Sequence, residues 1–164
     1  MRPDSAGEAV VGEIFGRGST QPARALTETE WTGIRQSRGL ALVERYWGAY
    51  VAFIIDGDEV SIVRAPLGDV GCYYARSVDT LIVASDLALL LAASGRARRI
   101  SMPALARHIA YPEWRSGETC VDGVGELRGG DRLTVSETLA DLAAEKRLRI
   151  LDESVERGKF PGGC

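Results

Sequence analysis

Apolar and polar positions alternate most regularly over residues 49–65, where two β-rich runs flank the segment Asp-Gly-Asp-Glu. The Asp-Gly pair accepts the positive φ of a tight turn, so the pattern predicts a β-hairpin. Apolar side chains occupy both faces of the first run, with Tyr50, Ala52 and Ile54 on one face and Val51, Phe53 and Ile55 on the other. A strand with two apolar faces is typically buried on both, so we expect a sheet with another layer packed on each side.

Shorter patterned runs predict the remaining elements. Thr27 and Glu30 form a capping-box pattern at the start of one predicted helix, and Gly39 is placed to end it. Ser85 or Asp86 is placed to cap the helix over residues 87–94, and Ser101 to cap the helix that follows it. Adjacent hairpins in a mixed order of strands and helices favour an α+β fold with antiparallel sheets over a doubly wound fold. The other expected strands cover residues 8–16, 80–85 and 132–135 with a short strand after Gly71, and the expected helices cover 28–38, 40–47, 87–94 and 101–111.

The composition is typical of a globular chain that forms one domain, with 164 residues, 45% hydrophobic and 26% charged. A net charge of −3 creates no field that would recruit nucleic acid or an anionic membrane. No apolar run is long enough to span a bilayer, and the N-terminus lacks the pattern of a secretory signal. Three widely spaced cysteines, Cys72, Cys120 and Cys164, fit a reducing compartment. We therefore expect a cytoplasmic protein with no nucleic-acid or membrane partner.

The residue pattern contains no motif that would carry catalysis or hold a metal ion. His108 is the single histidine, and no G-x-S-x-G elbow or phosphate-binding loop is present. Cys72 is more simply interpreted as a buried small apolar residue than as a nucleophile. From the residues alone, we predict an α+β domain with no catalytic residue and no metal ligand.

The composition changes abruptly after residue 135, where Glu, Lys and Arg become frequent. We therefore divide the chain into a domain over residues 1–135 and an atypical C-terminal tail over residues 136–164. The last residues, Gly-Lys-Phe-Pro-Gly-Gly-Cys, are expected to fray.

Four stretches within residues 8–135 follow one another as they do in asparagine-synthetase-like proteins. These stretches are VVGEIFG, RYWGAYVAFIIDGDEVSIVRAPLGDVGCYYA, LIVASDLALLL and ETCVDGVGELRGGDRLTV. The wording of RYWGAYVAF and RHIAYPEWRSGETCVDGV is most similar to the branch of ATP-dependent macrolactam cyclases that close lasso peptides.

The resemblance implies the N-terminal glutaminase domain of that family, a type 2 glutamine amidotransferase with the N-terminal-nucleophile hydrolase fold. That fold is a four-layer α/β/β/α sandwich of two antiparallel sheets, here N-terminally incomplete. In a working member, an N-terminal cysteine cleaves glutamine and passes ammonia to a synthetase domain that uses ATP and Mg²⁺. This chain carries no Ser-Gly-Gly-x-Asp-Ser signature of that second domain, so ATP and Mg²⁺ are implied only for a synthetase domain that the chain lacks.

Departures from the family pattern fall on the glutamine site. The chain begins Met-Arg-Pro, without the cysteine nucleophile. Gly12 and Glu13 of the glutamine-holding strand are kept, but Val11 stands where the family has Asn, and Val cannot hydrogen-bond a substrate. Glu28 occupies the acidic position before the helix. The resemblance thus implies a vestigial glutamine site of Gly12, Glu13 and Glu28, with no catalytic residue.

Two functions remain open on these grounds. The first is a scaffold or docking domain of an ATP-dependent amide ligase, a lasso-peptide cyclase, whose partners are a synthetase domain or chain, the lasso precursor peptide and leader-processing proteins. The alternative is a fragment of a glutamine-hydrolysing asparagine synthetase. A stand-alone binding module is a third, weaker reading. An incomplete sheet also exposes an unpaired strand edge, so we expect self-association or poor solubility.

Overall fold

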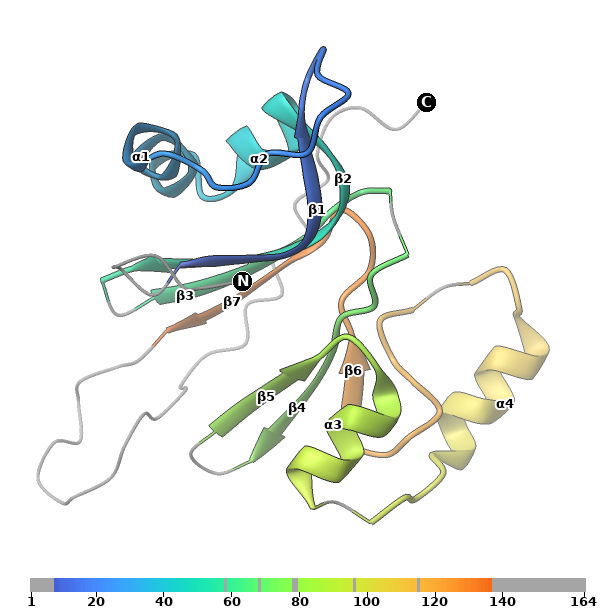
Figure 1. The fold of residues 1–164 in the computed structure, drawn as a ribbon. Helices are drawn as coiled ribbons and strands as arrows, with labels where there is room; N and C mark the ends of the chain where they lie inside the picture. The colour runs from blue at the N-terminus through green and yellow to red at the C-terminus, as the bar shows by residue number, and fades with distance from the viewer. Residues whose placement is uncertain are drawn as a thin grey trace, which may run out of the picture. The chain divides into compact units, whose positions relative to one another are not determined.

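The protein is an α+β structure with two antiparallel sheets in two compact units (Figure 1). The computed structural model describes residues 8–136, apart from 58, 68, 78, 79, 96 and 115. Unit 1 comprises Met1–Val70 with Gly129–Cys164, and unit 2 comprises Gly71–Arg128. The predicted tail lies outside the described residues except for Ser136, so the boundary at residue 135 stays a prediction.

Unit 1 is a four-stranded sheet with two helices over one face (Figure 1). Its strands lie in the order β1-β2-β3-β7, and every neighbouring pair is antiparallel. The elements are β1 (Ala9–Gly16), α1 (Glu28–Gln36), α2 (Leu40–Arg45), β2 (Tyr46–Asp56), β3 (Glu59–Arg64) and β7 (Arg132–Ser136).

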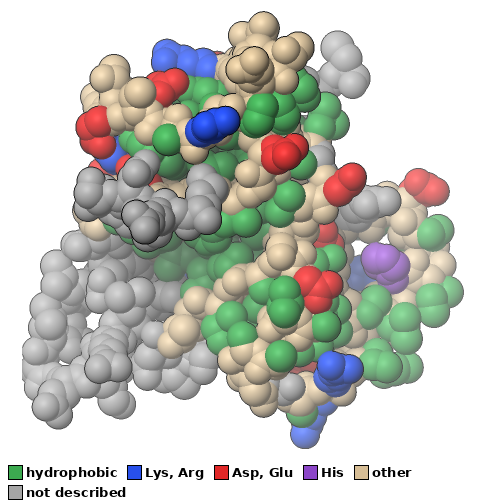
Figure 2. Space-filling view, in the orientation of Figure 1, with side chains coloured by type: hydrophobic (Ala, Val, Ile, Leu, Met, Phe, Trp, Pro, Cys, Tyr) green, Lys and Arg blue, Asp and Glu red, His purple; other side chains and the backbone are tan. Residues whose placement is uncertain are grey.

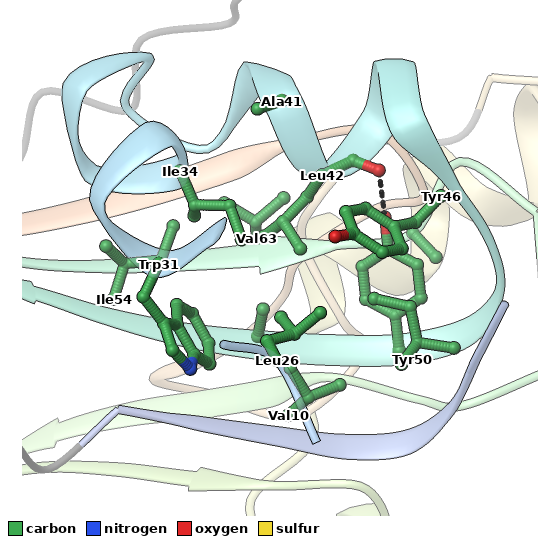
Figure 3. Close-up of a cluster of buried hydrophobic side chains, with 13 residues drawn as sticks. Val10, Leu26, Trp31, Ile34, Ala41, Leu42, Tyr46, Tyr50, Ile54 and Val63 are labelled. Atoms are coloured by element: carbon green, nitrogen blue, oxygen red, sulfur yellow. Dashed lines mark hydrogen bonds between the residues drawn. The ribbon is translucent and has the colours of Figure 1, made fainter. Parts of the chain in front are cut away.

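The predicted hairpin is confirmed as β2 and β3, which pair from Asp56 and Glu59 at the turn to Val51 and Arg64. Gly57 has φ 59° in the turn, as the Asp-Gly pattern requires. The face of β2 below the helices forms the main core of unit 1 (Figure 3). That core joins buried strand residues to buried helix residues, namely Val10, Tyr50, Ala52, Ile54 and Val63 to Trp31, Ile34, Ala41 and Leu42.

The opposite face of the same sheet is also apolar. Val51, Ile62 and Leu133 are 3%, 1% and 2% exposed, and the register places Ile62 beside Leu133. Phe53 and Ile55 on this face are half-buried. The prediction that the central strand is buried on both faces is therefore confirmed at its centre and is weaker toward the hairpin end.

The predicted helix over residues 40–47 is too long. Helix α2 ends at Arg45, and Tyr46 and Trp47 already belong to β2, paired with Gly16 and Phe15 of β1. Aromatic and β-branched residues favour strands, and pairing with β1 overrides the local helical pattern.

Gly48 lies inside β2 with φ 134° and does not act as a helix breaker. A Cβ at this position would collide with the main-chain oxygen of Glu13. Glycine is therefore required because the backbones of β1 and β2 approach each other closely here.

Unit 2 is a three-stranded sheet in the order β5-β4-β6 with two helices. Its elements are β4 (Tyr73–Ser77), β5 (Thr80–Ala84), α3 (Leu87–Ser94), α4 (Met102–Ala110) and β6 (Val124–Glu126). The predicted caps are confirmed, because Asp86 accepts from the first turn of α3 and Ser101 accepts from Ala104. Leu90 and Leu91 of α3 pack with Ala75 and Val124.

The sequence pattern does not reveal β6, which lies between the expected helix over residues 101–111 and the expected strand over residues 132–135. It has three residues, and its central Gly125 gives no side-chain alternation. A Cβ at Gly125 would collide with the ring of Tyr74, so the glycine makes room for a neighbouring side chain.

Candidate functional site

Gly12 and Glu13, two of the residues that the resemblance implies for a glutamine site, lie on β1 at one edge of the unit 1 sheet. Gly12 pairs with Tyr50 and Glu13 pairs with Ala49 on β2. Both Gly12 and Glu13 are exposed. After β1 the chain turns back along the same strand. Pro22 forms an isolated antiparallel bridge with Phe15, and Ala23 N donates to Ile14 O at 2.7 Å.

Gly12 has a conformational role that does not depend on a ligand. Its φ is 105°, and a Cβ would collide with the main-chain oxygen of Ala49. Together with Gly48, it allows β1 and β2 to approach closely. The glycine that the resemblance assigns to a glutamine site is thus also needed for strand pairing.

Val11 is 47% exposed beside Gly12 and presents only an apolar side chain. At this position the family that the sequence resembles carries an amide. A valine offers neither a donor nor an acceptor, so it cannot orient a substrate amide or stabilise an oxyanion.

Glu28 lies in the first turn of α1, and it takes part in an ion-pair network that the sequence did not reveal. Arg35 donates to Glu28 Oε1 at 2.6 Å and to Glu8 Oε1 at 2.6 Å. The Glu28 side chain is 75% exposed, whereas that of Glu8 is 1% exposed. Through Glu8, which directly precedes β1, the network connects the start of this strand to helix α1.

The hydrogen bonds to Glu28 and then to Glu8 raise the pKa of Arg35. Stability depends more on Glu8, because that carboxylate is cut off from water and Arg35 compensates its charge. Glu28 and Arg35 lie seven positions apart on one helix, whereas Glu8 is 27 positions from Arg35 and only the tertiary fold brings it in.

Glu30 confirms the predicted capping box and adds a tertiary partner. The backbone N and the Oγ1 of Thr27 each donate to Glu30 Oε2 at 2.7 Å, and Tyr46 Oη donates to Glu30 Oε1 at 2.6 Å. The bonds from Tyr46 and then Thr27 lower the pKa of Glu30. Burial, followed by the bond to Glu30, raises the pKa of Tyr46 to about 12.

The three residues that the resemblance implies for a glutamine site do not form one bonded cluster. Gly12 and Glu13 are neighbours on β1, while Glu28 is engaged by Arg35 on α1. Within the described part of the chain, no hydrogen bond or ion pair joins Glu28 to Glu13. The carboxylate of Glu13 remains exposed on β1, where it can accept hydrogen bonds from a ligand.

The cysteines in the described part of the chain lie in unit 2. Cys72 is 2% exposed and Cys120 is partly buried. Cys164 lies outside the described residues. Neither described thiol is on β1 or α1, so neither adds a nucleophile to the strand that carries Gly12.

No group of His, Cys, Asp or Glu side chains between residues 8 and 136, in the parts that are described, could hold a metal ion. None of the described helices has the length and apolar character needed to cross a bilayer. No protein-family model and no curated protein matches this chain.

Proposed function

We propose that this chain is a non-catalytic amidotransferase-like domain of an ATP-dependent amide ligase, of the kind that closes lasso peptides. Its two antiparallel sheets form the inner layers of a four-layer α/β/β/α sandwich of the N-terminal-nucleophile hydrolase type. Its role is to support and dock a ligase domain or chain, which binds ATP and Mg²⁺.

The observation that carries this proposal is the sheet of unit 1. Its central strand is buried on both faces, with Ala52 at 0% and Val51 at 3% exposure, and α1 and α2 cover the face that carries Ala52. Burial of the second face means that a further layer packs there, which supports a layered sandwich of the proposed kind.

The composition of β1 supports a non-catalytic role. The strand keeps Gly12 and Glu13 but presents Val11 in place of an amide. Lasso closure joins the peptide's own N-terminal amine to a carboxylate, so this reaction consumes no ammonia. A domain that has lost glutamine hydrolysis can therefore still serve such a ligase.

Glutamine hydrolysis tests the catalytic half of the proposal. The purified chain, incubated with glutamine, is expected to release no more glutamate than a buffer blank, while an active glutamine amidotransferase serves as the positive control. Release above the blank that is lost on replacement of a cysteine would overturn the proposal.

Two observations test the proposed docking to a ligase, namely the neighbouring genes and direct binding. The DNA on either side of the gene is expected to encode an ATP-dependent ligase together with a leader-bearing precursor peptide and a transglutaminase-like protease. Co-expression of that ligase with this chain should yield a complex that co-elutes in size-exclusion chromatography. An upstream in-frame Met-Cys start would instead favour a fragment of glutamine-hydrolysing asparagine synthetase.

A further inference from the structure

We draw no further inference here: the strongest candidate, the exposed apolar patch of unit 2 formed by Ile100, Met102, Ile109, Tyr111 and Trp114 on α4 and its flanks (Figure 2), carries none, because nothing in the described part of the structure shows what covers it.

Discussion

At the scale of single residues, Gly12 shows how one position can satisfy a family pattern and a backbone constraint at once. Its positive φ and its closeness to Ala49 make glycine necessary even without glutamine. Backbone geometry alone therefore explains the glycine at position 12, and its presence is not evidence for a glutamine site.

Gly12→Ala is expected to destabilise the chain by more than about 2 kcal/mol, because Ala disfavours positive φ and its Cβ meets backbone. Gly16→Ala on the same strand is the matched control, since no atom lies within 4 Å of its Cβ. It should change stability by less than about 0.5 kcal/mol. Urea denaturation compares the two variants. Equal effects would show that close approach is not what requires Gly12.

The network of Arg35 allows a second comparison at residue scale. Arg35→Gln leaves Glu8 buried with its charge uncompensated, so it should lower the denaturant midpoint clearly more than a change at the exposed partner does. Glu28→Gln removes only the 75% exposed partner and should cost less than about 0.5 kcal/mol. Denaturant midpoints at neutral pH measure both changes. A larger loss in Glu28→Gln would contradict the assignment of Glu8 as the partner that matters for stability.

At the scale of elements, the start of α1 combines a local cap with a tertiary contact. Thr27 and Glu30 satisfy each other's backbone groups, as the sequence predicts, and Tyr46 reaches Glu30 from the next segment. Removal of the cap by Thr27→Ala should cost about 1 kcal/mol.

The contribution of Glu30 should depend on pH. Its pKa is lowered in the folded chain relative to the ordinary value of 4.5, so its stabilising effect is present above that value. The effect is lost as pH falls through the lowered pKa. The stability difference between the native chain and Glu30→Gln should therefore shrink in acid. Thermal melts from pH 7 down to about 3 follow this difference, and a constant difference would contradict the role of the ionised carboxylate.

Element boundaries show where local pattern gives way to tertiary pairing. The capped starts of α1, α3 and α4 follow from side chains that act within a few residues, and the structure confirms each of them. The end of α2 at Arg45 depends on β1, which draws Tyr46 and Trp47 into a strand. Local sequence carries no information on that partner, which is far away along the chain.

At the scale of the whole molecule, the second face of the unit 1 sheet is the feature with the widest consequence. A sheet covered by helices on one side could leave the other side in water, yet Ile62 and Leu133 are almost fully buried there. The proposed four-layer arrangement depends on this burial.

Leu133→Ala tests the second face directly. Removal of a fully buried leucine should cost about 2–5 kcal/mol, because the cavity left behind adds to the lost burial. Val11→Ala on the same face is the control, since Val11 is 47% exposed and should lose less than about 1 kcal/mol. Chemical denaturation of both variants measures the loss of folding free energy in each. A cost below 1 kcal/mol for Leu133→Ala would show that the second face is open to solvent.

The candidate site was only partly accessible to sequence reasoning. Gly12, Glu13 and Glu28 were identified from a resemblance, and the structure places the first two on one exposed stretch of β1. The ion pair between Glu8 and Arg35 and the bond from Tyr46 to Glu30 join residues 27 and 16 positions apart. No spacing rule for helices or strands reaches that far, so these partners could not be predicted.

By itself, the sequence determined the α+β class, the hairpin around Gly57 and the capped helix starts, because each rests on turn chemistry or periodicity over a few residues. The tertiary structure decided which face of each element is covered. The stripe of α4 has an ordinary amphipathic pattern, and only its surroundings show that Met102 and Ile109 face outward. Periodicity reports that an apolar face exists, while its burial depends on whichever segment, or other molecule, packs against it.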